Sequence, residues 1–403
     1  MKSLKIAYRT LGRNRRRMIL TTALIAIGVV FVLLFSAFSG SFKNYMIGQI
    51  TDSMLGHIQI HQKGYVASLD NMPLDKNIPE HRLRAIEREL ALTEGVKSYS
   101  LRLKHSALIS NFETSTNIRL NGIDPAREHE TLPLLRSRII GNADFGKGEV
   151  LIPDIVARGM NLKIGDSVVL VVTNNIGSMN ARTFKVAGIL QSISGPGGRD
   201  GYVHIEDSRM LLRLQHNEAN EIAVRLNDLS DLKKVYKQLS ASLLASNKPP
   251  LELHGWEELS PFSSIAKMID LMSISIQIIL ISIVLISILN VMIMSVYERI
   301  REIGTMSAIG TPASFIMATF LFEGILLGLF GLAAGTALSY GIVYWIGDMT
   351  ISFGRQDDIL LTPVLSAVKV ALIGILVIVV SGVASLYPAI KAARMNPVDA
   401  LRS

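Results

Sequence analysis

Four apolar runs, almost free of charged residues, constrain the fold of this chain more than any other feature of its sequence. They cover residues 18–41, 271–297, 313–347 and 370–390. Each run reaches the roughly 20 residues that a helix needs to cross a bilayer. Only 18% of the chain is charged, whereas a soluble domain is nearer a quarter charged. We therefore predict four transmembrane helices. The first is expected to be retained as an anchor, since its apolar core is longer than that of a signal peptide.

Basic residues near the ends of these runs predict the orientation of the chain. Residues 1–17 carry Lys and Arg but no acidic residue, and such segments usually stay in the cytosol. Four crossings then place residues 391–403 in the cytosol as well, and residues 42–264 and the loop 348–369 outside. The net charge of +8 is explained by this topology, so no nucleic-acid partner is predicted.

Residues 42–264 are expected to form a folded α/β domain in two parts. The order strand, helix, strand, strand, and later strand, helix, strand resembles a split βαβ plan, which we assign to a porter-like part at 42–123 and 219–264. Short alternating segments separated by turn residues predict a β-rich insert at 124–218. The expected fold class is thus a membrane α-helical part with an external α/β domain between helices 1 and 2. The expected external helices cover 78–93 and 228–245, and the expected strands cover 57–62, 96–110, 116–123, 148–153, 165–172, 182–190, 201–205, 221–227 and 251–256.

No pattern in the sequence predicts catalysis. The chain contains no P-loop and no G-x-S-x-G nucleophile motif. It has no cysteine, which excludes disulfides and thiol catalysis. Its eight histidines are scattered. His57 and His61 have the spacing of a helix face but lie in an expected strand, so no metal site is predicted. We expect no catalytic residue in this chain and no metal or cofactor bound by it.

The stretch "YERIREIGTMSAIGTPASF" at 297–315 is charged and glycine-punctuated, yet it lies directly between two apolar runs. It predicts a short amphipathic cytoplasmic element at 298–312. Gly304 and Gly310 would relax or end its helix, and Pro312 suits the first turn of the next one. Ile300, Ile303 and Met306 would offer an apolar side to a docking partner. The residues assigned to this element are Glu298, Arg299, Arg301, Glu302, Ile303, Gly304, Met306 and Gly310.

The third apolar run contains one ionisable residue and a row of glycines. Glu323 lies about ten residues into the run, roughly 15 Å along a helix. An acid at that depth has a functional role or serves as a structural partner for a backbone or Ser/Thr group on a neighbouring helix, the interpretation we favour. Small residues spaced by four, three and four allow close helix packing, within the subunit or across a dimer; a role in a transport pathway is the alternative. These glycines are Gly324, Gly328, Gly331 and Gly335.

Three segments together resemble a known family. "ERIREIGTMSAIG", "GEVLIPDIVARGMNLKIGDSVVL" (148–170) and "LYPAIKAARMNPVDALRS" (386–403) are similar to the FtsX-like ABC transporter permeases of the MacB and lipoprotein-releasing LolC/LolE type. The resemblance implies that the segment 298–312 docks on a cytoplasmic ABC ATPase dimer, which binds ATP and Mg²⁺ in place of this chain. It also implies a second permease copy or a paralogue, and a place in the bacterial inner membrane with both termini cytoplasmic and the large domain periplasmic.

Within the family, "VTNNIGSMNART" (172–183) resembles the lipoprotein-releasing branch, in which a hairpin here recruits a periplasmic carrier. The candidate partner residues are therefore Asn174, Asn175, Ile176 and Met179, for a carrier or a membrane-fusion protein. The implied function is mechanotransmission from the ATPase to the periplasmic domain, for lipoprotein release or export of lipophilic cargo. The alternatives are an FtsX-type regulator of cell-envelope hydrolases, a tripartite efflux permease for drugs or peptides, and a membrane receptor without an ATPase.

Overall fold

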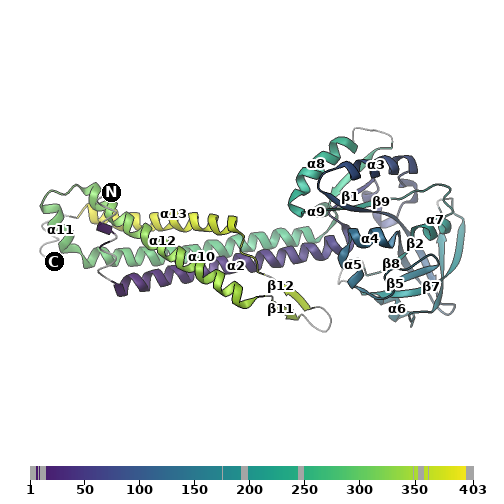
Figure 1. Cartoon of the computed structure of the whole chain (residues 1–403), viewed down its shortest axis with the longest axis horizontal. Coiled ribbons are helices and arrows are strands. Elements are labelled where there is room, and N and C mark those ends of the chain that lie inside the picture. Colours follow the sequence, from purple (N-terminus) through teal and green to yellow (C-terminus); the bar gives the residue numbers. More distant parts are fainter. Residues whose placement is uncertain are drawn as a thin grey trace. The chain divides into compact units, whose positions relative to one another are not determined.

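The computed structural model of the chain forms two compact units, shown in Figure 1. The helical unit comprises Met1–Tyr45 and Ala266–Ser403, and the external unit comprises Met46–Ile265. Asn175 and the C-terminal residues 396–403, both used in the sequence analysis, lie outside the described residues. The described residues are 6, 7, 9, 15–174, 176–191, 198–243, 249–347, 349–352, 358–361 and 363–395.

Four long helices match the four apolar runs. They are α2 (Arg15–Ile50), α10 (Phe262–Glu298), α12 (Ala313–Ile346) and α13 (Ala367–Ala393). Within the described part of the chain, these four are long and apolar enough to cross a membrane, which confirms the predicted fold class. The segment between α12 and α13, expected as an external loop, contains the antiparallel hairpin of β11 (Met349–Ser352) and β12 (Asp358–Leu361).

The helices bury one apolar face and expose the other. Ile25 of α2, Ile288 of α10 and Val377 of α13 are buried in a common core. Leu20 and Ile278, in contrast, are 70% and 60% exposed. An apolar outer surface on helices of this length suits a lipid environment. A helix also satisfies its own backbone polar groups, as the water-free core of a bilayer requires.

The external unit is built on a ten-stranded sheet in the order β10-β1-β9-β2-β3-β8-β5-β7-β4, with β6 paired to β2 and β7. Its strands are β1 (Ile58–Gln62), β2 (Val96–Ser110), β3 (Ser115–Ile123), β4 (Ile139–Gly141), β5 (Glu149–Pro153), β6 (Ser167–Thr173), β7 (Met179–Leu190), β8 (Asp200–His204), β9 (Glu221–Leu226) and β10 (Leu251–Gly255). Its helices and short turns are η1 (Thr51–Leu55), η2 (Val66–Asn71), η3 (Leu74–Lys76), α3 (Glu80–Leu92), α4 (Pro125–Thr131), α5 (Pro133–Ser137), α6 (Asp154–Gly159), α7 (Ile205–Leu212), η4 (Leu229–Asp231), α8 (Leu232–Leu243) and α9 (Trp256–Leu259).

Three apolar cores lie in this unit, and β2 contributes to two of them. One core joins β1, β9 and β10 to α3 and α8, which Figure 1 shows beside these strands. A second joins β5 to β8 with α6 and α7, and a third lies around Leu132, Phe145 and Tyr202. The first half of β2 pairs with β9, whereas residues 103–110 pair with β3 and β6. The second core therefore takes side chains from 103–120, which the sequence analysis assigned to the porter-like part.

A buried group of charges holds β2 to its neighbours. Arg102 is fully buried and binds Glu128 of α4 at 2.8 Å and Glu221 of β9 at 2.6 Å. Lys104 binds Glu221 at 2.7 Å. Burial alone would raise the pKa of Glu221, but Lys104, His61 and Arg102 outweigh it and hold that pKa well below its usual value. Removal of one partner would leave a buried unpaired charge, which is strongly destabilising.

Candidate coupling site between the second and third spans

A short helix, α11 (Ile300–Ala308), lies where the sequence predicts an amphipathic element. Helix α10 ends at Glu298, and Arg299 leaves the helical conformation with φ −116° and ψ 19°. The other end of α11 is closed by two hydrogen bonds, from Thr311 N–H to Met306 O and from Gly310 N–H to Ser307 O. Gly310 has φ +87°, the left-handed conformation that this helix end requires and glycine adopts without strain.

Arg299 and Glu323 lie against each other inside the helical unit. The Nη1 atom of Arg299 is 3.2 Å from Oε2 of Glu323, and its Nε donates to Oε2 of Glu302 at 2.9 Å. Ser295 Oγ donates to Oε1 of Glu323 at 3.4 Å. The guanidinium also lies over the ring of Phe320, 5.4 Å from its centroid. The structural interpretation of Glu323 is therefore favoured, with the hydroxyl of Ser295 on the neighbouring helix as one partner and Arg299 as an additional one.

The apolar side of α11 faces the chain's own core, which corrects one expectation. Ile303 and Met306 were assigned to a docking partner, but Ile303 is 1% exposed in a cluster with Ile316 and Phe320, and Met306 packs against the same cluster. Gly304 is buried too. An amphipathic pattern predicts that a helix has an apolar side, but it does not predict which neighbouring element or partner packs against that side.

The outer side of α11 is polar, with one apolar residue that the sequence analysis missed. Ile309 is 80% exposed. It follows the last residue of α11, and a helical spacing of three from Met306 would have assigned it to the buried side, so the sequence contains no signal of its exposure. The exposed residues of the segment are Glu298, Arg301, Glu302, Thr305, Ala308, Ile309, Gly310 and Pro312. This outer side is the surface of the segment that a partner can reach.

The four glycines of α12 are places of close helix contact within the chain. A Cβ atom added at Gly324 or Gly328 would lie 2.5 Å or 2.7 Å from Cβ of Ser385 or Ser381 on α13. One added at Gly331 or Gly335 would lie 2.6 Å or 2.7 Å from Cβ of Ile25 or Val29 on α2, respectively. The row thus serves two neighbouring helices, and packing within the subunit accounts for all four positions.

The candidate partner hairpin lies between β6 and β7. Asn174 is buried, and its side-chain oxygen accepts from the backbone N–H groups of Ile176 and Ser178. Ile176 and Met179 are 82% and 68% exposed. Met179 also lines a hollow of about 850 Å³ between strands of the external unit. Of the four predicted residues, Ile176 and Met179 are thus accessible, whereas Asn174 shapes the turn.

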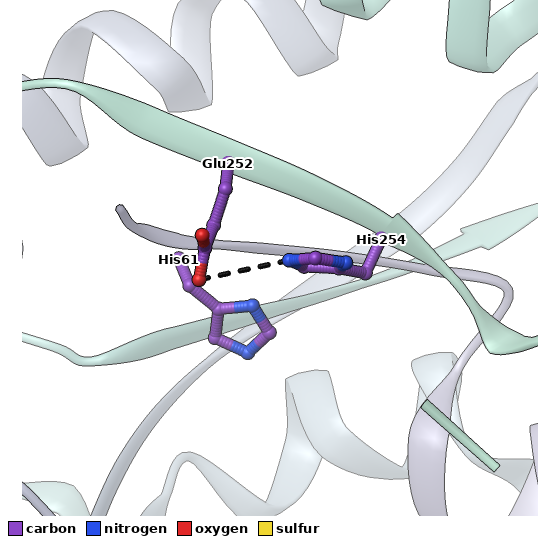
Figure 2. A group of neighbouring side chains, drawn as sticks. All are labelled: His61, Glu252 and His254. Carbon is purple, nitrogen blue, oxygen red and sulfur yellow. Dashed lines mark ion pairs between the residues drawn. The ribbon is translucent and has the colours of Figure 1, made fainter. Parts of the chain in front are cut away.

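One group of side chains in the described residues has the composition of a metal site. His61, Glu252 and His254 each bring a ligand atom to the same place (Figure 2). The sequence analysis found no ligand set, because His61 is nearly the whole length of the external segment away from the other two. The pairing of β1 with β10 brings them together.

Comparison with known proteins finds similar membrane permeases over the whole chain. Residues 18–242 match the model of the MacB-like periplasmic core domain, and residues 273–397 match that of the FtsX-like permease C-terminal region. The chain is 25% identical to YknZ, an ABC transporter permease of Bacillus subtilis (strain 168), over 100% of this chain and 99% of YknZ. It is 21% identical to the lipoprotein-releasing system transmembrane protein LolC of Haemophilus influenzae, over 94% of this chain and 91% of LolC. It is 26% identical to the probable export ATP-binding/permease protein MacB of Pseudomonas entomophila, over 99% of this chain and 58% of MacB.

Proposed function

Because the chain belongs to the family of ABC transporter permeases with a MacB-like periplasmic core domain and an FtsX-like C-terminal region, we propose that it transmits ATP-driven motion from a separate cytoplasmic ATPase to its external unit. The likeness to a combined ATP-binding/permease protein, of which this chain spans 58%, supports a division of labour in which this chain is the permease and has no ATPase activity of its own. Its partners are an ABC ATPase dimer and a second permease, either another copy or a paralogue.

The observation that carries this proposal is that α11 is packed firmly against the helical unit on one side and exposed on the other. Its inner side is fixed by Ile303 in the core and by the pair of Arg299 and Glu323. Its outer side exposes Arg301 and Ile309. A helix held in this way moves together with α10 and α12, so a force applied to its outer side reaches both spans. An element that was merely a loop between two helices would dissipate such a force.

The cargo we propose is a lipoprotein or another lipophilic molecule released from the outer leaflet of the inner membrane. The likeness to LolC over most of both chains supports this branch. The buried polar side chains of the described helical unit are hydroxyl groups except for Glu323, which is engaged by Arg299. A polar route through the bilayer would usually need more lining groups than this. The exposed Ile176 and Met179 would then meet a periplasmic carrier or a membrane-fusion protein.

We place the chain in the bacterial inner membrane with its termini and α11 in the cytosol and its external unit in the periplasm. The basic residues of 1–17 support this orientation through the preference of such segments for the cytosol.

The test is a pair of substitutions on the outer side of α11, Arg301→Glu with Ile309→Asp. Both positions are exposed, so the spans should insert and fold normally. Loss of one well-formed interface contact commonly costs about 1–3 kcal/mol, roughly 5- to 150-fold in affinity. We expect less ATPase recovered with the purified chain and weaker stimulation of its activity.

The matched control is Lys234→Glu, the same reversal of charge as Arg301→Glu at an exposed position of α8 in the external unit. It should leave ATPase recovery and stimulation unchanged. Full recovery and full stimulation with the double variant of α11 would refute the coupling assignment.

A further inference from the structure

Three side chains with metal-ligating groups leave the sheet of the external unit on one face. β1 runs antiparallel to β10, and His61 lies opposite Glu252 in their register. His254 is two residues further along β10, so it shares the face of Glu252. Ile60 and Leu253, the intervening residues, belong to the core with α3 and α8. Figure 2 shows the two imidazoles and the carboxylate gathered at one place.

The spacing of the three groups is close to that of ligands around one ion. One ligand atom from each residue lies within 4.8 Å of the other two. Oε1 of Glu252 is 3.6 Å from Nε2 of His254, the dashed line in Figure 2. Bonds of about 2.0–2.1 Å place two ligands of a tetrahedral zinc ion about 3.3 Å apart. The side chain of His254 is 21% exposed, and a rotation of its imidazole towards Glu252 is the adjustment that zinc binding would require.

Each imidazole has one nitrogen held by a carboxylate and one buried nitrogen without a hydrogen-bond partner. Nε2 of His61 lies 3.4 Å from Oε2 of Glu221, and Nδ1 of His254 lies 2.8 Å from Oε2 of Glu258. The nitrogens without a partner are Nδ1 of His61 and Nε2 of His254. When the N–H of a neutral imidazole donates to a carboxylate, the other ring nitrogen carries a free lone pair. Metal-binding histidines are oriented by this same arrangement.

The protonation states suit a cation as well. Burial lowers the pKa of His61, so its imidazole is neutral near pH 7. Burial alone would raise the pKa of Glu252, but the backbone N–H groups of Gly64 and Val66 and the nearby imidazoles lower it below its usual value. The carboxylate is therefore ionised. Metal ions bind deprotonated ligands, so neither group has to lose a proton first.

The nearest cations are already neutralised by carboxylates. Arg102 and Lys104 both bind Glu221, and Arg102 also binds Glu128. The two carboxylates thus offset these two positive charges, and the remaining effect of Lys104 on His61 helps to lower the pKa of that imidazole. The ring of Tyr65 stacks on His61 with centroids 5.0 Å apart, which fixes the imidazole plane and keeps water from that side.

We propose that His61, Glu252 and His254 bind a divalent transition-metal ion, Zn²⁺, that ties β1 to β10. Two imidazoles and one carboxylate are a ligand set that zinc accepts, with water completing the tetrahedron. β1 is the first strand of the external unit and β10 its last. The ion therefore clamps the beginning of this unit to its end and stabilises the folded unit, since a ligand that binds only the folded state shifts the folding equilibrium.

The experiment uses the full chain, purified in detergent without a polyhistidine tag, loaded with zinc and dialysed. We expect the wild-type chain to retain about one zinc ion, as a site with three protein ligands does, measured by mass spectrometry of the metal. Its thermal unfolding temperature should rise with zinc. Trp256, which is buried two residues after His254, reports that transition by its fluorescence when every chain compared also carries Trp345→Phe, because Trp345 is 86% exposed. The variant His254→Ala should lose both the retained zinc and the rise.

Two further variants make the result specific. Glu258→Gln keeps all three ligands and alters a side chain that is 57% exposed, so folding should survive while zinc affinity falls roughly 10- to 100-fold. His216→Ala removes an exposed histidine outside the group and should behave as wild type. Failure of the wild-type chain to retain zinc, or equal retention by His254→Ala and wild type, overturns the site.

Discussion

Arg299, at the break between α10 and α11, forms an ion pair with Glu323 in the first third of α12, with Nη1 and Oε2 3.2 Å apart. Their side chains are only 11% and 5% exposed. The pair therefore ties the first residue after one span to the interior of the next. It explains why an acidic residue is present inside an otherwise apolar helix, and it gives α11 a fixed position against α12.

Glu323→Gln should weaken this attachment markedly. Loss of one partner of a buried ion pair costs about 3–5 kcal/mol, and the lower end applies here because Glu302 still binds Arg299. We expect a lower unfolding temperature of the chain in detergent and reduced stimulation of the ATPase. The control, compared by the unfolding temperature alone because Glu302 lies on the outer side of α11, is Glu302→Gln, which removes a carboxylate from the exposed side of the same arginine and should cost no more than about 1 kcal/mol. Equal effects of the two variants would contradict a buried role for Glu323.

Two glycines of α12 should respond in opposite ways to the same added methyl group. Gly328→Ala would place a Cβ atom 2.7 Å from Cβ of Ser381, and such overpacking typically costs about 1–3 kcal/mol. A Cβ atom at Gly341 would meet nothing within 4 Å, so Gly341→Ala should stabilise the helix by about 0.5–1 kcal/mol. Unfolding temperatures of the two variants in detergent decide this. A Gly328→Ala chain as stable as the Gly341→Ala chain would show that the contact with α13 is not tight.

The elements of this fold could be predicted because their signals are local. An uncharged run of sufficient length or an alternating pattern needs no knowledge of the rest of the chain, and β2 was predicted over its full extent, Val96–Ser110. Pairing is not local, so the sharing of β2 between two cores could not be foreseen. Helix α4 was missed although its signals were present: Asp124 caps the N–H groups of Ala126 and Arg127, and Pro125 occupies the first turn.

In the candidate sites, too, local features could be predicted and contacts between distant segments could not. The position of α11 could be predicted from charges and glycines within a few residues, whereas the direction of Ile303 depends on how α10, α11 and α12 pack. Arg299 was expected to belong to a docking surface, and only the fold shows it paired with Glu323. His61 and His254 became neighbours through the register of β1 and β10, for which the sequence contains no local signal.

Acid should destabilise the external unit through His105. Burial lowers the pKa of this histidine to about 4, against about 6.5 in an unfolded chain. Between these values the unfolded chain binds the proton and the folded one does not, so stability is lost as the pH falls from 6.5 towards 4. The difference of about 2.5 units corresponds to roughly 3 kcal/mol. His61, whose pKa burial also lowers, adds to the slope in the same direction.

The contribution of His105 is isolated by His105→Gln, whose amide can still accept the hydrogen bond from Ser208 Oγ. Unfolding is followed by the fluorescence of Trp256 in a chain with Trp345→Phe, since Trp345 is 86% exposed in α12 and would obscure the signal. The stability advantage of wild type over the variant at pH 7 should shrink by roughly 3 kcal/mol at pH 4. Parallel curves for the two proteins would exclude His105 as the titrating group.

Thiol labelling should place α11 and the hairpin of β6 and β7 on opposite sides of the membrane. The chain has no cysteine, so Ile176→Cys and Ile309→Cys each introduce a single thiol, at residues that are 82% and 80% exposed. In cells with a permeabilised outer membrane, a reagent that cannot cross the inner membrane should label position 176 and not 309, because the basic residues of 1–17 hold that end of the chain in the cytosol. Protection of 309 by a bound ATPase is separated from sidedness in inside-out vesicles stripped of peripheral proteins, where 309 should react and 176 should not. Labelling of 309 from the outside, with protection of 176, would reverse the orientation of all four spans and remove α11 from the reach of a cytosolic ATPase.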